Sequence, residues 1–315
     1  MDYLYIFTGF VLLYFGAELL VRGSSELARR FGLSPLVIGL TVVAFGTSAP
    51  ELAVSVDAAL KGRSDIALGN VIGSNIANIG LILGTAALIQ RLTIRAQLVR
   101  IDLRVLIAVS LLTPLILWDR EIGRAEGLVL ASGLVVYLVY TVTLARRARA
   151  TVIAEFQDAI PLPVRRAWLE VLMVAMGVAL LITGAEALVF GAVRIAQQYQ
   201  ISTAIVGLTV VAVGTSLPEL ATSIVAAIRR EGDLVVGNVV GSNIFNLLGI
   251  VGISSLVAPI RPLAIEPVDL LVMIVMTVVL LPLMRTGMRL TRMEGVLLLA
   301  GYAAYIGYLL LRVTG

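Results

Sequence analysis

Apolar runs of about 20 residues recur along the whole chain, and this pattern constrains the fold more than any other feature of the sequence. A helix of that length crosses a bilayer core of roughly 30 Å. We count ten such runs and predict an all-α polytopic membrane protein with ten transmembrane helices. The runs lie near residues 2–21, 35–60, 66–89, 101–118, 125–145, 168–193, 203–228, 234–257, 268–284 and 294–312.

The composition agrees with this prediction and excludes several kinds of chemistry. Hydrophobic residues make up 59% of the chain and charged residues 14%, against about 45–50% and about 25% in soluble domains. With no cysteine and no histidine, the chain cannot build disulfides, thiolate or imidazole metal sites, or Cys/His nucleophiles. We expect no enzymatic activity, no cofactor, no nucleic-acid partner and no obligatory protein partner. The expected partner is the lipid bilayer.

The distribution of basic residues predicts the orientation. Short loops on the cytoplasmic side of a membrane are rich in Lys and Arg. With the N-terminus outside, the cytoplasmic connections hold 16 of the 24 Lys and Arg residues. We therefore expect a multi-pass protein of the cell membrane with both termini outside. The Arg-rich stretch 147–166 is the expected cytoplasmic linker between units 1–146 and 167–315.

The two units contain a long internal repeat. A shift of 168 residues aligns Gly39–Gly80 with Gly207–Leu248 without a gap, and 25 of the 42 positions are identical. A weaker match pairs Glu18 with Glu186. Equivalent positions are five spans apart, and five is odd, so the second copy must be inverted relative to the first. Inverted repeats are typical of secondary transporters, whose substrate sites lie near the midplane where the repeats meet.

Each copy carries Gly-Thr-Ser-x-Pro-Glu in the middle of an apolar span. Pro50 has no N–H to bond the carbonyl of Gly46, and its ring clashes there. We therefore predict that helices 2 and 7 are broken at mid-membrane, with the glycine tolerating the irregular backbone. Carbonyls freed at that depth line a cavity or coordinate cations in transporters.

A carboxylate follows each predicted break, Glu51 in the first copy and Glu219 in the second. An ionised acid at bilayer depth costs about 2.5–3.5 kcal/mol, so it is normally retained for ions or protons. Two such acids beside hydroxyl and carbonyl oxygens suit a hard cation such as Ca²⁺, which takes six to eight oxygen ligands. The alternative is that each acid only hydrogen-bonds to a facing helix.

The helix after each break presents a polar stripe. Asn70, Ser74 and Asn78 recur every four residues and lie on one helical face. Asn238, Ser242 and Asn246 repeat this stripe in the second copy. We expect these side chains to complete the site near the glutamates. The alternative, hydrogen bonds between helices without a ligand, applies most to Asn70 and Asn238.

Other charged residues have local interpretations. Glu18 can pair with Arg22 one turn later, and Asp57 with Lys61. Arg104 and Asp102 are expected to reach the cytoplasmic interface, as charged side chains near the ends of membrane helices do.

At these motifs the sequence resembles the calcium:cation antiporter superfamily, specifically its prokaryotic sodium/calcium exchanger branch. The segments Gly46–Glu51 and Gly214–Glu219 are similar to the two signature regions of that family. Gly-Ser-Asn-Ile-x-Asn on each following helix is similar as well, and the resemblance extends over all ten spans. It implies exchange of Na⁺ for Ca²⁺, with spans 1 and 6 sliding across a fixed core.

The resemblance also implies roles for single residues. Glu51 and Glu219 would be shared between Ca²⁺ and Na⁺ sites, and the carbonyls of Thr47 and Thr215 would ligate Ca²⁺. The remaining implied ligands are Ala212, Ser216 and Ser74 for an outward Na⁺ site, Ala44, Ser48 and Ser242 for an inward Na⁺ site, and Asn78 and Asn246 beside the central position.

One position departs from part of the family and leaves alternatives open. Several members, including potassium-dependent ones, carry Asp where this chain has Asn246, which argues against co-transport of K⁺. A Ca²⁺/H⁺ antiporter, or one for other divalent cations, fits the same scaffold. A cation channel lined by the same oxygens is a further alternative, although inverted repeats around one closed site argue against it.

Overall fold

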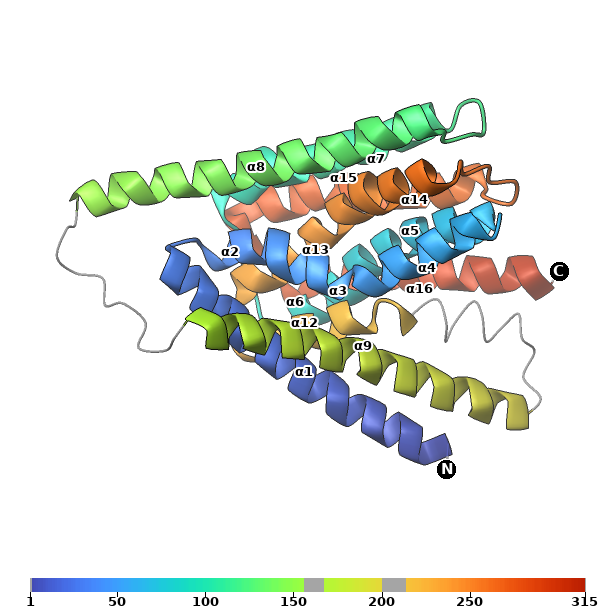
Figure 1. Ribbon diagram of the computed structural model, residues 1–315, viewed down its shortest axis with the longest axis horizontal. Coiled ribbons are helices and arrows are strands. Elements are labelled where there is room, and N and C mark those ends of the chain that lie inside the picture. Colours follow the sequence, from blue (N-terminus) through green and yellow to red (C-terminus); the bar gives the residue numbers. More distant parts are fainter. Residues whose placement is uncertain (1, 156–166, 200–213, 315) are drawn as a thin grey trace.

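The computed structural model describes residues 2–155, 167–199 and 214–314 and shows an almost entirely helical protein (Figure 1). Seven helical stretches in these ranges are long and apolar enough to cross a membrane, and one bent pair makes up to eight. The all-helical, multi-span character predicted from the apolar runs is therefore confirmed.

Two long helices lie against each other along one side of the bundle (Figure 1). They are α1 (Asp2–Phe31) and α9 (Ala167–Gln198). Glycines let the two backbones touch, because a Cβ on Gly16 would lie 2.8 Å from the amide nitrogen of Leu181. Ion pairs join both ends of this pair of helices. Arg30 forms two hydrogen bonds of 2.6 and 2.7 Å with the buried Glu170, and Arg194 lies 2.8 Å from Asp2.

The opposite side of the bundle is formed by helices from both halves of the chain (Figure 1). These are α7 (Leu103–Ile116), preceded by the π-helical segment η3 (Leu98–Asp102), α8 (Arg124–Glu155) and α15 (Pro267–Arg285). Helix α16 (Arg292–Thr314) lies nearer the middle of the view. Many apolar side chains on these helices are exposed, as expected for surfaces that face lipid.

Two spans occupy the centre, and each is interrupted by a π-helical segment. One runs through α5 (Ser64–Ala77), η2 (Asn78–Leu83) and α6 (Gly84–Ile89). The other runs through α13 (Gly232–Ile244), η5 (Phe245–Ile250) and α14 (Val251–Val257) and is completely buried within its most apolar window. These two spans carry the predicted polar stripes, so the stripes lie inside the protein.

The span predicted at 35–60 is broken, as its Gly-Thr-Ser-x-Pro-Glu motif indicates. It consists of α2 (Pro35–Ile38), η1 (Gly39–Val43), α3 (Ala44–Thr47) and α4 (Ala49–Leu60). The parts before and after Ser48 are bent by 47°. In the second copy, α12 (Leu217–Ile228) follows the motif, while most of the preceding part, residues 200–213, lies outside the described residues.

Short connections join the spans. Strands β1 (Leu92–Thr93) and β2 (Arg289–Leu290) pair antiparallel, with Leu92 opposite Leu290. The 3₁₀ turn η6 (Thr286–Met288) precedes β2. At another connection, Ile122 and Ile260 form an isolated antiparallel bridge.

Two of the ten predicted spans are not among the eight candidates. The one at 101–118 corresponds to η3 and α7, which carry Arg100, Asp102 and Arg104 near their start. The one at 203–228 is described only from residue 214. Helix α8 continues to Glu155, so the first part of the predicted linker is helical, and residues 156–166 lie outside the described ranges.

Candidate cation site

The two copies of the Gly-Thr-Ser-x-Pro-Glu motif have the same local backbone conformation at their serines. Ser48 has φ −84° and ψ 8°, and Ser216 has φ −88° and ψ 6°, so each serine leaves the helical conformation just before a new helix begins. Pro50 and Pro218 stand in the first turn of α4 and α12, where a missing N–H is tolerated. Each helix after the break therefore starts with a glutamate in its first turn.

The glycines of the motifs have a role that sequence reasoning did not identify. Neither Gly46 nor Gly214 has a positive φ, so a left-handed backbone does not require glycine at these positions. Instead, a Cβ on Gly46 would lie 2.7 Å from Cγ2 of Val178, and one on Gly214 would lie 2.3 Å from Cγ2 of Val189. Both glycines allow α9 to pack directly against the helix breaks.

The two glutamates are linked across the halves of the chain. Ser48 Oγ donates a 2.8 Å hydrogen bond to Glu219 Oε1. Reciprocally, Ser216 Oγ donates a 3.2 Å hydrogen bond to Glu51 Oε1. The structure thus brings together the two acids that the sequence places 168 residues apart.

Both carboxylates are buried and only half satisfied. Glu51 and Glu219 are each 1% exposed, and Oε2 of each has no hydrogen-bond partner. A buried charge is very costly unless it is paired or coordinates a cation. The described residues contain no group of three or more acidic, His or Cys side chains, so any further ligands must be neutral oxygens. Such a donor set fits a hard cation.

The threonines of the motifs connect to the polar stripes. Thr47 Oγ1 donates to Asn238 Oδ1 at 3.2 Å, and Thr215 Oγ1 donates to Asn70 Oδ1 at 3.4 Å. Asn70 in turn donates to the backbone carbonyl of Glu51 at 3.1 Å. Asn70 and Asn238 therefore hold the helix breaks in place, which agrees with the alternative interpretation of these two residues.

Sequence reasoning missed Ser55 and Ser223, which continue this network. Asn70 Nδ2 donates to Ser55 Oγ at 3.0 Å, and Asn238 Nδ2 donates to Ser223 Oγ at 3.3 Å. The two serines are identical between the repeats, and that identity could have revealed them.

The inner members of the stripes lie where the π-helical segments begin. Asn78 Nδ2 donates to Asn243 Oδ1 at 2.9 Å, and Asn246 Nδ2 donates to Asn75 Oδ1 at 3.2 Å. These bonds orient the two amides and leave Oδ1 of Asn78 and Oδ1 of Asn246 buried without a partner. π-Helical segments occur frequently at functional sites. Asn75 and Asn243 belong to the repeated Gly-Ser-Asn motif, but the sequence alone did not indicate that they pair across the halves.

The implied ligands of the two sodium sites differ in their surroundings. Ser242 Oγ is buried without a partner, whereas Ser74 Oγ donates to the carbonyl of Asn70 at 2.7 Å. The carbonyl of Ala44, expected to be freed by the break, accepts a 3.0 Å hydrogen bond from the amide of Ser48. Ala212 lies outside the described residues.

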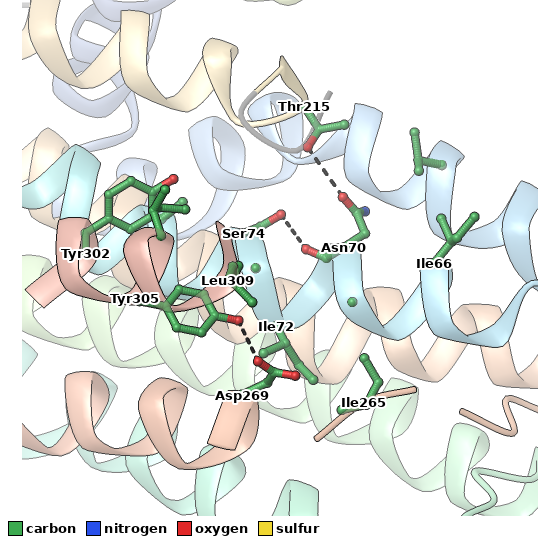
Figure 2. A pocket seen from close by; sticks show the side chains of 15 residues that line it. Ile66, Asn70, Ile72, Ser74, Thr215, Ile265, Asp269, Tyr302, Tyr305 and Leu309 are labelled. Atoms are coloured by element: carbon green, nitrogen blue, oxygen red, sulfur yellow. Dashed lines mark hydrogen bonds between the residues drawn. The ribbon is translucent and has the colours of Figure 1, made fainter. Parts of the chain in front are cut away.

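A cavity of about 390 Å³ reaches the network from the side of α15 and α16. Its wall includes Asn70, Ser74 and Thr215 (Figure 2). On the far wall Tyr305 OH donates to Asp269 Oδ1 at 2.9 Å (Figure 2). A second cavity of about 570 Å³ touches Ala44, Gly46 and Gly241 from the side of α8 and α9.

Two of the interpretations of other charged residues are confirmed and one is wrong. Lys61 lies 2.7 Å from Asp57, and Arg22 lies 2.7 Å from Glu18. Asp102 does not reach an interface, because it is fully buried and accepts a 2.9 Å hydrogen bond from Tyr137. The short side chain is held by a neighbouring helix that the local sequence does not reveal.

A multi-span helical bundle with a broken span and two half-satisfied buried carboxylates is typical of membrane ion transporters. The comparisons identify which kind. The model of the family described as sodium/calcium exchanger protein matches residues 1–143 and 169–311. The chain belongs to this family, as its resemblance to sodium/calcium exchangers predicted.

Relatives and solved structures agree over nearly the whole length. CaxA of Alkalimonas amylolytica is 40% identical over 97% of this chain and 96% of its own. The sodium/calcium exchanger MaX1 of Methanosarcina acetivorans is 30% identical over 97% of both chains. A structure of the sodium-calcium exchanger NCX_Mj, soaked with Na⁺ and Sr²⁺, has a TM-score of 0.84 at 34% identity over 97% of both chains.

Proposed function

We propose that this protein is a secondary active antiporter that exchanges Na⁺ for Ca²⁺ across the cytoplasmic membrane by alternating access. The observation that carries the proposal is the reciprocal pairing of Ser48 with Glu219 and of Ser216 with Glu51. It places two carboxylates at one buried position and leaves an oxygen of each without a partner. A cation is the ligand that satisfies both.

The transported ions would be held by the acids and by neutral oxygens around them. The proposed ligand set consists of Glu51, Glu219, Thr47, Thr215, Ser48, Ser216, Ala44, Ala212, Ser74, Ser242, Asn78 and Asn246. The unpartnered oxygens of Asn78, Asn246 and Ser242 support this set. No cofactor takes part in the proposed mechanism, in which Ca²⁺ and Na⁺ are substrates.

The proposed architecture has ten transmembrane helices in two inverted five-helix repeats, residues 1–146 and 167–315, with 147–166 as a cytoplasmic linker and both termini outside. The matching backbone at Ser48 and Ser216 supports the repeat. So do the matching pairs Thr47–Asn238 and Thr215–Asn70. Such a repeat gives a transporter two equivalent ways to open, one to each side.

The charge of the site explains why transport would be exchange. Two ionised glutamates are nearly neutralised by one Ca²⁺ or two Na⁺. An empty site would leave two bare charges in a low-dielectric interior, and switching access in that state would be costly. If three Na⁺ move per Ca²⁺, one net charge crosses the membrane, and the voltage contributes about 2.3 kcal/mol per 100 mV.

Uptake of ⁴⁵Ca²⁺ into proteoliposomes tests the proposal. Uptake should follow an outward Na⁺ gradient and should stop in Glu51→Gln and in Glu219→Gln. The matched control is Glu126→Gln, which removes an exposed acid on α8 and should leave uptake unchanged. Unaltered exchange in both variants would show that Glu51 and Glu219 do not form the cation site.

The same vesicles separate the proposal from its main rival, a Ca²⁺/H⁺ antiporter. Gradients of Na⁺, K⁺ and H⁺ are imposed one at a time. Uptake driven by a pH gradient in sodium-free buffer would favour proton exchange, and uptake without any counter-ion would favour a channel. The proposal requires that the Na⁺ gradient alone be sufficient.

A further inference from the structure

Glu18 on α1 makes an ion pair with a residue far away in the chain. Arg229, which follows the last residue of α12, donates two hydrogen bonds to its carboxylate. Glu18 is 17% exposed and Arg229 34% exposed. This contact joins α1 to the helix that carries Glu219.

The internal repeat provides the same two charges at a second place. The shift of 168 residues takes Glu18 to Glu186 on α9 and takes Arg229 back to Lys61 at the end of α4. The signs of both charges are kept. In the structure these two residues are apart: Lys61 pairs with Asp57, and Glu186 is exposed with no ion pair to any described residue.

Lys61 and Arg229 lie at opposite ends of the bundle. Ser64, which opens α5 just after Lys61, accepts a 2.9 Å hydrogen bond from the amide of Arg261. Gly232, just after Arg229, packs beside Gln90, which follows the other end of the same span (Ser64–Ile89). The Glu18–Arg229 ion pair is thus formed on the side of Arg229, while the equivalent ion pair of Lys61 with Glu186 is absent.

Glu186 occupies the position in α9 that Glu18 occupies in α1. It lies one turn before Val189, whose side chain packs on Gly214 at the helix break. Glu18 likewise precedes Val21 by three residues, and Val21 is buried. An isolated carboxylate in the middle of a 32-residue apolar helix is costly, and a partner in another state of the protein accounts for it.

We propose that Glu18–Arg229 and Glu186–Lys61 are reciprocal ion pairs that position α1 and α9 in the two access states of the exchanger. The first pair forms in the state seen here, and the second replaces it when access changes to the other side. The proposal rests on the proposed inverted repeat and alternating access. None of the four residues belongs to the proposed ligand set, so they are positioning residues.

The positions at which the repeats differ support this exchange of partners. Arg22 is replaced by Phe190 in the second copy, and Asp57 by Val225. Arg22 already lies 2.7 Å from Glu18 and would neutralise it after Arg229 has left. Asp57 neutralises Lys61 while Glu186 is distant. Arg22 and Asp57 thus each neutralise a charge in the state in which that charge lacks its partner on the other helix.

Cross-linking tests the proposal without measuring transport. The chain contains no cysteine, so pairs can be introduced without background. Glu18→Cys with Arg229→Cys, and Lys61→Cys with Glu186→Cys, are treated with a short bifunctional maleimide in liposomes. The products are identified by mass spectrometry. We expect both pairs to cross-link, and in a variant carrying all four cysteines we expect either link in a molecule but never both.

A further substitution makes the test directional. Adding Glu18→Gln to the Lys61→Cys/Glu186→Cys variant should raise its cross-linking rate about fivefold, the scale expected for loss of a partly exposed ion pair. Asp119→Asn, which removes an exposed acid from the α7–α8 turn, is the control and should change nothing. A purely structural role for Glu18 would not raise the rate.

The proposal is overturned if residues 61 and 186 never cross-link, if both links form in one molecule, or if Glu18→Gln leaves the rate unchanged. Because cross-linking needs no ion flux, the outcomes can be separated. Exclusive links in a protein without Na⁺-driven Ca²⁺ uptake would reject the proposed transport reaction and leave the reciprocal ion pairs standing.

Discussion

Ser48 lies in the first half of the chain and hydrogen-bonds to Glu219 in the second, with 2.8 Å between Ser48 Oγ and Glu219 Oε1. Each glutamate is thus oriented by the serine that precedes the other glutamate by three residues, because Ser216 bonds to Glu51 in the same way. The two helix breaks therefore form one site, and neither carboxylate is positioned by its own motif alone.

Removing one of these serines should weaken the site without removing a charge. In Ser48→Ala, Glu219 Oε1 loses the donor that orients it. Hydrogen bonds to charged groups contribute about 1.5–3 kcal/mol, so we expect a roughly tenfold or larger rise in the half-saturating ion concentration for exchange. Ser110→Ala is the control, because that buried hydroxyl makes no hydrogen bond. Equal ion dependence in both variants would contradict the role of Ser48.

The pairs between asparagines make a second prediction. Asn243→Ala removes the acceptor that orients Asn78, and Asn75→Ala removes the acceptor that orients Asn246. Losing a buried partner costs about 1–3 kcal/mol, so the half-saturating Ca²⁺ concentration should rise about tenfold in each. Isotope uptake over a range of Ca²⁺ concentrations measures this. The interpretation would be wrong if only maximal velocity fell and the Ca²⁺ dependence stayed the same.

Close packing at the helix break gives a prediction with a built-in rescue. Gly46→Ala would place a methyl group 2.7 Å from Cγ2 of Val178, and overpacking of this kind costs about 1–3 kcal/mol. We expect lower thermal stability and slower exchange. Adding Val178→Ala makes room and should restore both. If the double variant is no more stable and exchanges no faster than Gly46→Ala, close packing against α9 does not explain why glycine is needed at position 46.

The ion pair between Arg30 on α1 and Glu170 on α9 should contribute far more to the stability of the fold than an exposed ion pair does. Glu170 is fully buried and depends on Arg30, so Arg30→Gln leaves a buried charge unpaired, at a cost of about 3–5 kcal/mol. Asp57→Asn breaks a pair in which both side chains are more than half exposed and should cost about 0–1 kcal/mol. Thermal unfolding in one detergent compares the two. Similar losses of stability in the two variants would contradict the larger contribution expected of the Arg30–Glu170 pair.

Features that depend on local sequence were predicted well. Eight of the ten apolar runs correspond to helices or a bent helix pair that can cross a membrane, because length and hydrophobicity largely decide whether a helix can do so. Pro50 predicted the break in its helix, because proline lacks the N–H that continues a helix. The ion pairs Glu18–Arg22 and Asp57–Lys61 followed from their spacing of four residues.

Features that depend on contacts between distant segments were missed. Nothing in the sequence indicates that Asn75 and Asn243 pair with the opposite stripe, or that Arg229 reaches Glu18. The position of Asp102 near the end of a span predicts that it reaches the interface, but Tyr137 holds it inside the protein. The need for glycine at Gly46 was assigned to the backbone, whereas Val178 of another helix creates it.

The sequence by itself determined that the chain is a multi-span helical protein, that its motif is duplicated, and that a glutamate, Glu51 or Glu219, ends each copy of the motif. Periodicity, proline chemistry and the cost of a charge in lipid act on residues that are close in the chain. Only the tertiary structure decided that Ser48 bonds to Glu219 and Ser216 to Glu51. That pairing depends on how helices from the two halves of the chain pack against each other. The spacing of residues along the sequence therefore does not predict it.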